Sequence, residues 1–229
     1  MAEEIMNNQA RAYTAASVIR EIQRGRPEKA LRLLEKLLRD SPDNPVLLNL
    51  KGVALGMMGE HEESLACYEA VIRADPALAV YWNNKGLALQ NLGNYAEAEE
   101  MYREALSRDP ESLEARYNLA NTLQSLGRPE EALDWYRKVL SFRPDHILTM
   151  LNMGNALAVL ERYDEAIAVY LEILEICPEY PDASYNLGHT YEEKKDPKTA
   201  GEWYRKTLQI DPDYHHAQER LTLIEKGED

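Results

Sequence analysis

Apolar and polar positions along the chain follow one order that returns every 34 residues. In residues 79–112, apolar and small side chains recur at helical spacing until Gly93, and they resume this spacing from Ala98 to the pair Asp109 and Pro110. Glycine allows a sharp reversal of the backbone, and proline cannot extend a helix. Each unit therefore reads as helix, turn, helix and stop, which predicts an all-α chain of antiparallel helix pairs.

Columns of identical residues set the register of the repeat. One column holds Gly52, Gly86, Gly154 and Gly188, a second holds Tyr68, Tyr102, Tyr136, Tyr170 and Tyr204, and a third holds Pro42, Pro76, Pro110, Pro144, Pro178 and Pro212. The resulting units are 11–44, 45–78, 79–112, 113–146, 147–180 and 181–214, and a capping helix is expected over 215–226. Because a solenoid grows by adding repeats, we expect one continuous domain over residues 1–229.

The first, fifth and sixth units contain departures from the pattern. The first unit has Val18 where the second, third, fifth and sixth units have glycine, which is typical of a terminal, capping copy. The fifth and sixth units have Glu161 and Lys195 in place of the turn glycine. We expect a slightly different turn geometry at these two residues, with the repeats themselves retained.

The order of Trp82, Gly86, Ala98, Tyr102 and Pro110 in one unit resembles the tetratricopeptide repeat. The resemblance covers nearly 90% of the chain. It implies a right-handed α-solenoid in which the first helix of each unit lines a concave groove. With the first residue of a unit counted as offset 1, it implies that offsets 2, 5, 6, 9, 12 and 13 face this groove; we call them the groove offsets. The expected function is protein–protein interaction, and the partner is not specified.

Asparagine occupies offset 6 in four successive units, at Asn84, Asn118, Asn152 and Asn186. Asparagine costs a helix interior roughly 0.5 kcal/mol relative to alanine, and its carboxamide can both donate to and accept from a peptide backbone. This ladder is similar to the one in the tetratricopeptide superhelix of O-linked N-acetylglucosamine transferase, where it grips peptide backbone. The alternative is that these amides bond to the neighbouring helix or to water and set the superhelical twist.

The resemblance gives a set of candidate peptide-binding residues at the groove offsets. They are Asn49, Asn83, Asn84, Tyr117, Asn118, Asn121, Gln124, Leu151, Asn152, Asn155, Tyr185, Asn186 and His189. Asp182, Glu192 and Glu193 are placed to select a basic residue near the C-terminal end of the groove. Replacing Asn118 and Asn152 by alanine is expected to weaken a bound peptide without changing the melting temperature.

Charge limits the class of partner. The chain has 40 acidic and 26 basic residues, for a net charge of -14, which repels phosphate backbones and anionic membranes. We therefore expect neither nucleic acid nor a membrane as partner. The first residues lack the regions of a signal peptide, and no long apolar run is present, so we expect a cytoplasmic protein. Cys67 and Cys177 lie three repeats apart and are expected to be free thiols.

Catalytic and metal-binding patterns are weak. His61 and Glu62 begin like a zinc-protease helix, but Leu65 stands where the second histidine would be needed. His189 shares a helical face with Glu192 and Glu193, although exposed groups of this kind are usually solvated. We expect no enzymatic activity, no metal and no cofactor.

A second function stays open beside peptide binding. The first unit has an apolar inner face, formed by Ala12, Ala15, Ile19 and Ile22, that a neighbouring molecule's end could occupy. The chain would then be a self-associating structural scaffold. A monomer whose mass in light scattering is independent of concentration would exclude this alternative.

Overall fold

The computed structural model describes residues 15–227, and α-helices joined by turns form all the regular structure in that range. The chain divides into two compact halves, which we call unit 1 (residues 1–122) and unit 2 (residues 123–229). The six 34-residue repeats keep their ordinal names, from the first unit to the sixth unit. The division between the two halves falls inside α7, Leu113–Ser125. Each unit is described by itself. The expectation of one continuous domain stays a prediction.

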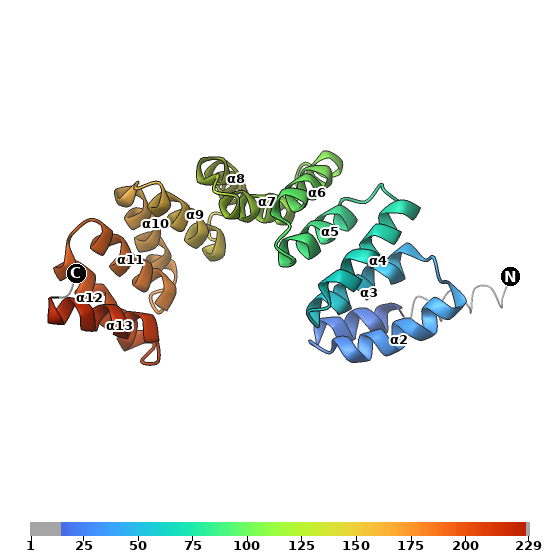
Figure 1. Cartoon of the computed structure of the whole chain (residues 1–229), viewed down its shortest axis with the longest axis horizontal. Coiled ribbons are helices and arrows are strands. Elements are labelled where there is room, and N and C mark those ends of the chain that lie inside the picture. The colour runs from blue at the N-terminus through green and yellow to red at the C-terminus, as the bar shows by residue number, and fades with distance from the viewer. Residues whose placement is uncertain (1–14, 228–229) are drawn as a thin grey trace. The chain divides into compact units, whose positions relative to one another are not determined.

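Unit 1 contains paired helices in chain order (Figure 1). After helical residues 15–23, these are α2 (Pro27–Asp40), α3 (Pro45–Met57), α4 (His61–Ala74), α5 (Ala79–Asn91), α6 (Tyr95–Arg108) and most of α7. Along this series α2 packs on α3, α3 on α4, α4 on α5 and α5 on α6. Each helix from α2 to α5 therefore contacts the next one along the chain, as in a solenoid.

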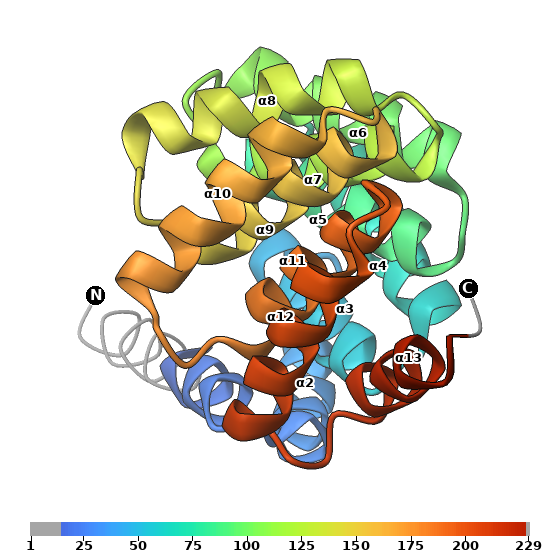
Figure 2. The ribbon, with the colours of Figure 1, turned by 90° about the vertical axis from the view of Figure 1, so that its left-hand side faces the viewer.

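Unit 2 continues the same arrangement. Its helices are the end of α7, then α8 (Pro129–Phe142), α9 (Ile147–Val159), α10 (Tyr163–Ile176), α11 (Pro181–Glu193), α12 (Pro197–Ile210) and α13 (His215–Lys226). Consecutive helices from α8 to α13 are in contact, and Figure 2 shows α11, α12 and α13 following one another at the C-terminal end. The predicted all-α solenoid of antiparallel helix pairs is confirmed.

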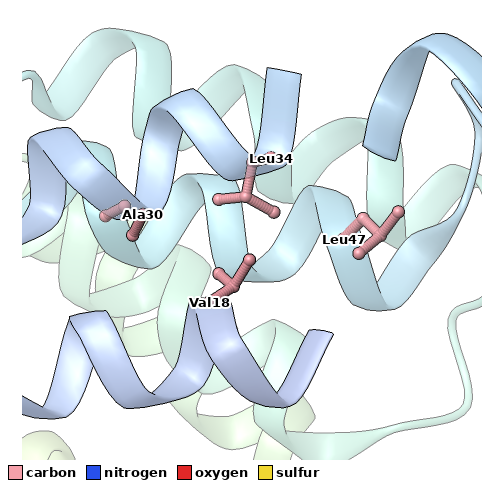
Figure 3. Packing of buried hydrophobic residues seen from close by; sticks show 5 residues of the cluster. Val18, Ala30, Leu34 and Leu47 are labelled. Carbon is pink, nitrogen blue, oxygen red and sulfur yellow. The ribbon is translucent and has the colours of Figure 1, made fainter. Parts of the chain in front are cut away.

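The alanine and tyrosine columns make close helix packing possible. Ala30, Ala98, Ala132, Ala166 and Ala200 are fully buried, and the tyrosine rings of units two to six are at most 4% exposed. In the first unit, Val18 replaces the usual glycine and is itself fully buried with Ala30, Leu34 and Leu47 (Figure 3). A small residue on the second helix thus lets the first helix approach, and a large ring fills the remaining space.

The turns between paired helices share one backbone conformation. Gly25, Gly59, Gly93 and Gly127 have φ values between 66° and 84°. Glu161 and Lys195 have φ values of 58° and 62° at the equivalent positions. The expectation of a different turn geometry at these two residues is wrong, because the turn keeps its left-handed residue and places an L side chain there at an energetic cost.

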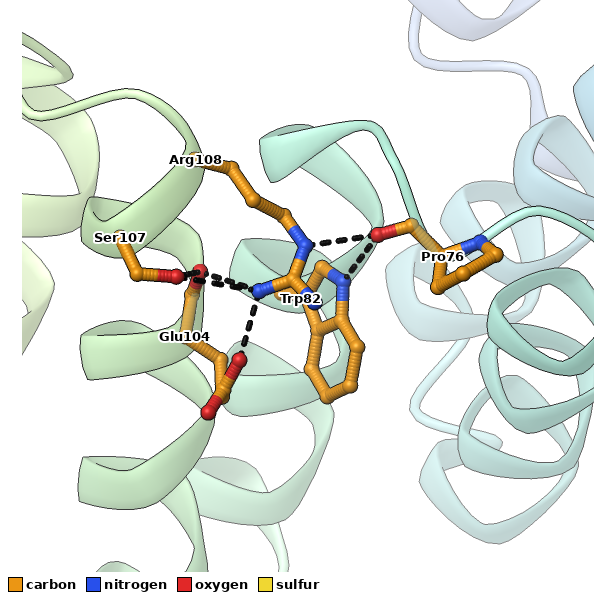
Figure 4. Close-up of polar contacts among 5 residues, drawn as sticks. All are labelled: Pro76, Trp82, Glu104, Ser107 and Arg108. Atoms are coloured by element: carbon orange, nitrogen blue, oxygen red, sulfur yellow. Dashed lines mark hydrogen bonds and ion pairs between the residues drawn. The ribbon is translucent and has the colours of Figure 1, made fainter.

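A cation and an indole fasten the connection between α4 and α5 in unit 1 (Figure 4). The carbonyl oxygen of Pro76 accepts hydrogen bonds from Trp82 Nε1 at 2.9 Å and from Arg108 Nε at 2.6 Å. The Arg108 guanidinium also lies 4.2 Å from the centroid of the Trp82 ring, within cation–π range. The contact ties α6 to the start of α5, so the two helices of the third unit hold the loop that enters it.

Candidate functional site

Residues at the groove offsets of unit 1 surround a pocket of about 410 Å³, which we call the Gly56 pocket. Val53, Gly56 and Met57 come from α3, and Asn84, Leu87 and Asn91 come from α5. Glu114 at the start of α7 and three residues of α4, His61, Ser64 and Tyr68, also line it. Groove offsets of three successive 34-residue repeats, the second to the fourth, therefore meet around one cavity within residues 1–122.

The pocket exists because one side chain is missing from a repeated contact. In the third unit, the Tyr102 hydroxyl donates a 3.0 Å hydrogen bond to Gln90 Oε1 at offset 12. In the fourth unit, Tyr136 donates a 2.9 Å bond to Gln124 Oε1 in the same way. The second unit has Gly56 at this offset, so no side chain extends over Tyr68 and the space stays open.

Tyr68 is a protonated hydrogen-bonding group in the pocket wall. Its side chain is buried, and this burial raises the pKa of the phenol to about 12 although a hydrogen bond with Ser64 acts to lower it. The Ser64 hydroxyl in turn donates a 2.8 Å bond to the carbonyl oxygen of Gly52. At neutral pH the pocket therefore offers a neutral phenol and no phenolate.

The charge of the pocket comes from Glu114, the one lining residue that is formally charged at neutral pH with histidine counted as neutral. This exposed carboxylate makes no ion pair within residues 15–227. His61 Nδ1 is buried in the same lining without a hydrogen-bond partner. The pocket combines apolar walls with unsatisfied polar groups and a negative charge at its rim.

The asparagine ladder of unit 1 forms hydrogen bonds between neighbouring repeats. Asn84 Nδ2 donates to Asn49 Oδ1 at 3.0 Å, and Asn118 Nδ2 donates to Asn83 Oδ1 at 3.1 Å. Asn83 is only 3% exposed, and its Nδ2 has no partner. Asn83 is therefore not accessible to a ligand, and we remove it from the candidate binding set.

These bonds also change one expectation about stability. Alanine at Asn118 would leave both polar atoms of buried Asn83 without a partner, which costs roughly 1–3 kcal/mol. We therefore replace the expected unchanged melting temperature by a decrease. Within unit 1, the alternative in which the amides link neighbouring repeats describes part of what they do.

In unit 2 the ladder has a different acceptor. Asn155 Oδ1 accepts hydrogen bonds from Asn186 Nδ2 at 2.9 Å and from the Tyr170 hydroxyl at 2.7 Å. Tyr170 uses Asn155 because offset 12 of this unit is Ala158, which has no polar side chain. Two donors occupy the carbonyl oxygen of Asn155, so its amide N–H groups are what it can still offer to a ligand.

The remaining candidates keep partial access to solvent. Asn49, Asn84, Tyr117, Asn118, Asn121, Gln124, Leu151, Asn152, Asn155, Tyr185 and Asn186 are half-buried, and His189 is exposed. The Tyr185 ring packs among other aromatic rings, because its centroid lies 5.6 Å from that of Tyr204 and 5.1 Å from that of Tyr214. It packs as part of the core under α13.

The acidic end of the groove is largely satisfied by α13 and the segment before it. Asp182 Oδ1 accepts a 2.9 Å hydrogen bond from the Tyr214 hydroxyl. Glu192 Oε2 accepts from the Tyr204 hydroxyl at 2.7 Å and from Arg220 Nε at 3.1 Å. Two of the three carboxylates expected to select a basic residue here are thus engaged inside unit 2, which weakens that expectation.

Large apolar side chains are exposed at the groove offsets of unit 1. Ile19, Val46, Met57, Val80 and Leu87 are 40–51% exposed. In unit 2, Leu148 and Val159 at groove offsets are 52% and 67% exposed. Contiguous exposed apolar surface rimmed by polar groups marks interaction sites in soluble proteins.

Sequence reasoning missed the Gly56 pocket and the part played by His61, Ser64 and Tyr68. The signal was present in the register, since offset 12 is glutamine in two neighbouring units and glycine in the second. Reading it required knowing that the tyrosine hydroxyl bonds to offset 12, which only the structure reveals.

Other classes of site find no support in the described residues. Over residues 15–227, histidine, cysteine and acidic side chains form no cluster of three or more that could hold a metal ion. None of the helices described is long and apolar enough to cross a membrane. Cys67 and Cys177 are free thiols, as the sequence predicted.

Comparisons with solved structures agree with this fold. YrrB, described as a TPR protein with an unusual peptide-binding site, is 25% identical over 81% of this chain and 96% of its own, with a TM-score of 0.67. PilF of Pseudomonas aeruginosa is 21% identical over 93% of this chain and 96% of its own, with a TM-score of 0.78. MamA is 20% identical over 75% and 94%, with a TM-score of 0.66.

Family models match most of the chain, and one of them, over residues 181–214, has the bounds of the predicted sixth unit. Models described as tetratricopeptide or TPR repeats match residues 21–85, 83–147, 154–195 and 181–214. The comparison with curated protein sequences gives no match. The repeat columns, the helix pairs and the family matches together show that this chain belongs to the tetratricopeptide repeat family.

Proposed function

We propose that this chain is an adaptor whose groove offsets bind an extended polypeptide. The observation that carries the proposal is the exposed apolar surface of unit 1, where Val46, Met57, Val80 and Leu87 stand at groove offsets. Two of these residues, Met57 and Leu87, also line the Gly56 pocket. Apolar side chains of a partner would lose contact with water on this surface, which is the main source of affinity in such interfaces.

The asparagine side chains supply the polar part of the contact. Asn84 and Asn118 each use one amide hydrogen in the bond to the neighbouring repeat. Each keeps a second amide hydrogen and a carbonyl oxygen, which match the C=O and N–H groups of an extended backbone. The ladder thus serves two purposes in this proposal: it connects repeats, and it presents their amides in a fixed orientation.

The free energy of binding requires both the apolar contacts and the asparagine hydrogen bonds. A net hydrogen bond contributes about 0.5–1.5 kcal/mol, whereas association costs roughly 4–15 kcal/mol. Amide contacts alone would therefore give weak binding. The exposed apolar groove residues must supply the remainder, and we expect micromolar affinity.

The comparisons support a binding role in a general way. Tetratricopeptide repeats serve in protein–protein interaction, and YrrB is described as having a peptide-binding site. The role we propose is binding without catalysis, in the cytoplasm, with a partner that is neither nucleic acid nor membrane. The net charge of -14 favours such a partner over an anionic one.

Asn118 and Asn83 provide a matched pair for testing the ladder. We would select binders from a library of random short peptides displayed on phage, and then titrate synthetic copies into wild-type protein, Asn118→Ala and Asn83→Ala. Both substitutions break the 3.1 Å inter-repeat bond, but only Asn118 is accessible to a peptide. The expected result is a loss of affinity of about tenfold for Asn118→Ala and an affinity within about twofold of wild type for Asn83→Ala.

Equal weakening by the two substitutions would mean that the ladder acts through repeat geometry alone. Unchanged affinity for both would place the peptide elsewhere on the protein and contradict the proposed groove. Circular dichroism at the titration temperature checks that both variants are folded.

Self-association through the first unit has less support than the sequence indicated. Ala15 and Ile22 pack against the core of their own unit, and Ala12 lies outside the described residues. Ile19 remains 41% exposed. Light scattering over a range of concentrations tests this alternative, and a mass that rises with concentration would favour the scaffold.

A further inference from the structure

We propose that the Gly56 pocket of unit 1 receives a cationic side chain, arginine or lysine, from the polypeptide bound to the groove. This inference rests on the proposed function for the source of the side chain. It assigns a specificity site at the second and third units, at the opposite end of the chain from the acidic residues that sequence reasoning favoured.

The shape of the pocket suits a long side chain with an aliphatic stem. Val53, Met57 and Leu87 provide apolar lining, and the volume of about 410 Å³ exceeds that of any single side chain, so water can remain around a charged head. Arginine and lysine place their methylene groups along apolar surface while the head group stays hydrated.

The charge of the pocket selects the head group. Glu114 offers a carboxylate that makes no ion pair within the described part of the chain, and neither lysine nor arginine lines the pocket. Asn84 uses an amide hydrogen for its bond to Asn49, so its carbonyl oxygen is available as an acceptor. Guanidinium and ammonium groups have donors only, and they form their strongest bonds with such acceptors.

Two further polar atoms fit the same occupant. His61 Nδ1 is buried and has no hydrogen-bond partner, so as the neutral imidazole's acceptor nitrogen it can receive a donor. The Tyr68 hydroxyl has no glutamine opposite it, unlike Tyr102 and Tyr136. A purely apolar ligand would leave His61 Nδ1 without a partner, and an anionic ligand would face Glu114.

The repeat itself supplies the variant that closes the pocket. A Cβ atom built on Gly56 would meet Ser64 Oγ at 3.5 Å, an ordinary van der Waals distance. Gly56→Gln is therefore tolerated by the backbone, and it reproduces the glutamine that accepts from tyrosine in the next two units. We expect this variant to melt at the same temperature as wild type or higher.

The test uses capped single amino acids, so it does not depend on finding a groove peptide. N-acetyl-arginine N-methylamide and its lysine counterpart are titrated into 15N-labelled protein, with N-acetyl-norleucine N-methylamide as the uncharged control for the stem. The expected result is that the cationic probes shift the backbone signals of Gly56, Met57 and Asn84 with an affinity at least about fivefold above that of norleucine. Glu114→Gln should remove most of this difference, and Gly56→Gln should abolish the shifts.

A norleucine probe that binds as tightly as the arginine probe would overturn the cationic assignment. Shifts that persist unchanged in Glu114→Gln, a substitution of an exposed residue that does not threaten folding, would overturn it as well. Either outcome leaves the groove proposal standing, because that proposal is decided by Asn118→Ala and Asn83→Ala with peptides. Conversely, if the peptide titrations contradict the proposed groove, the titrations with capped amino acids still decide whether the Gly56 pocket binds a cation.

Discussion

Gly86 and Tyr102 lie so close together that a Cβ atom built on Gly86 would be 2.8 Å from Cε1 of the tyrosine ring. The ring is fully buried, and its hydroxyl is held by Gln90, so it has little freedom to move away. The same relationship recurs between Gly52 and Tyr68, where the distance is 2.7 Å. The glycine and tyrosine columns of the sequence are thus one steric contact repeated along the solenoid.

Gly86→Ala is expected to lower the free energy of unfolding by about 1–3 kcal/mol, because the added methyl group overpacks this contact. Urea unfolding followed by circular dichroism measures the loss. The fourth unit provides the control, since it has Ala120 at this offset and this alanine is fully buried. Ala120→Gly should not stabilise the protein. A stabilised variant would show that a methyl group at this offset is unfavourable in the fourth unit as well.

Lys195→Gly is expected to stabilise unit 2 by about 0.5–1 kcal/mol. Lys195 has a φ of 62°, a region that costs an L residue roughly 1–2 kcal/mol, and glycine removes this cost while losing some entropy on folding. Lys195→Ala keeps the Cβ atom and serves as the control for loss of the charge. If alanine stabilises as much as glycine does, the effect comes from charge and the turn is not strained.

Much of the fold could be predicted from the sequence because the repeat states it several times. The starts of α3, α5, α7, α9 and α11 fall at the first residue of a predicted unit, since the proline and glycine signals act locally. The turn at Lys195 could not be predicted in the same way. Contacts within the adjoining helices hold that backbone in place, and they override the preference of the residue itself.

The candidate site was less predictable because its chemistry depends on which partner each side chain finds. Gln124 and Glu192 share offset 12, and both turned out to accept hydrogen bonds from the tyrosine column. Asn83 and Asn118 are both amides of one face, yet one is buried and the other half-buried. The helical period predicts which face of the helix a side chain is on. Whether a ligand can reach that side chain depends on the packing of the neighbouring repeat.

Raising the pH above about 10 should lower the free energy of unfolding, because several buried tyrosines stay protonated in the folded state and ionise in the unfolded state. Burial raises the pKa of Tyr68 to about 12 and also raises the pKa values of Tyr102, Tyr170 and Tyr204, whereas unfolded tyrosine ionises near about 10. Stability from these residues is complete below about pH 10 and is lost as pH rises toward the folded pKa values, by about 1.4 kcal/mol per pH unit for each tyrosine.

Urea unfolding at pH values from about 8 to 11.5, together with tyrosinate absorbance, measures this dependence. Tyr170→Phe should reduce its slope, because phenylalanine does not ionise. Tyrosinate that forms near pH 10 in these residues without any loss of helix would contradict the burial argument.

Arg220 is expected to fasten the C-terminal helix through Glu192. Burial opposes the charge of Glu192, but hydrogen bonds from Arg220 and Tyr204 outweigh it and lower the pKa of this carboxyl below its ordinary value. Arg220→Met should lower the free energy of unfolding by about 1–2 kcal/mol at neutral pH, a value reduced by the partial exposure of the arginine. Because the folded pKa is depressed, this contribution is present above about pH 4.3, the unfolded value, and is lost as pH falls through the folded pKa.

Arg205 offers the matched control, since it also joins α12 to α13 through a 2.8 Å ion pair with Glu225. The side chains of this pair are more than half exposed, Arg205 at 52% and Glu225 at 55%, whereas the side chain of Glu192 is 13% exposed. Solvent screens the exposed pair, so Arg205→Met should change stability by less than about 0.5 kcal/mol at any pH. If the two substitutions cost the same, and the cost of Arg220→Met does not shrink in acid, then α13 is held by apolar packing of Leu221 and Ala217 and the buried carboxylate contributes nothing specific.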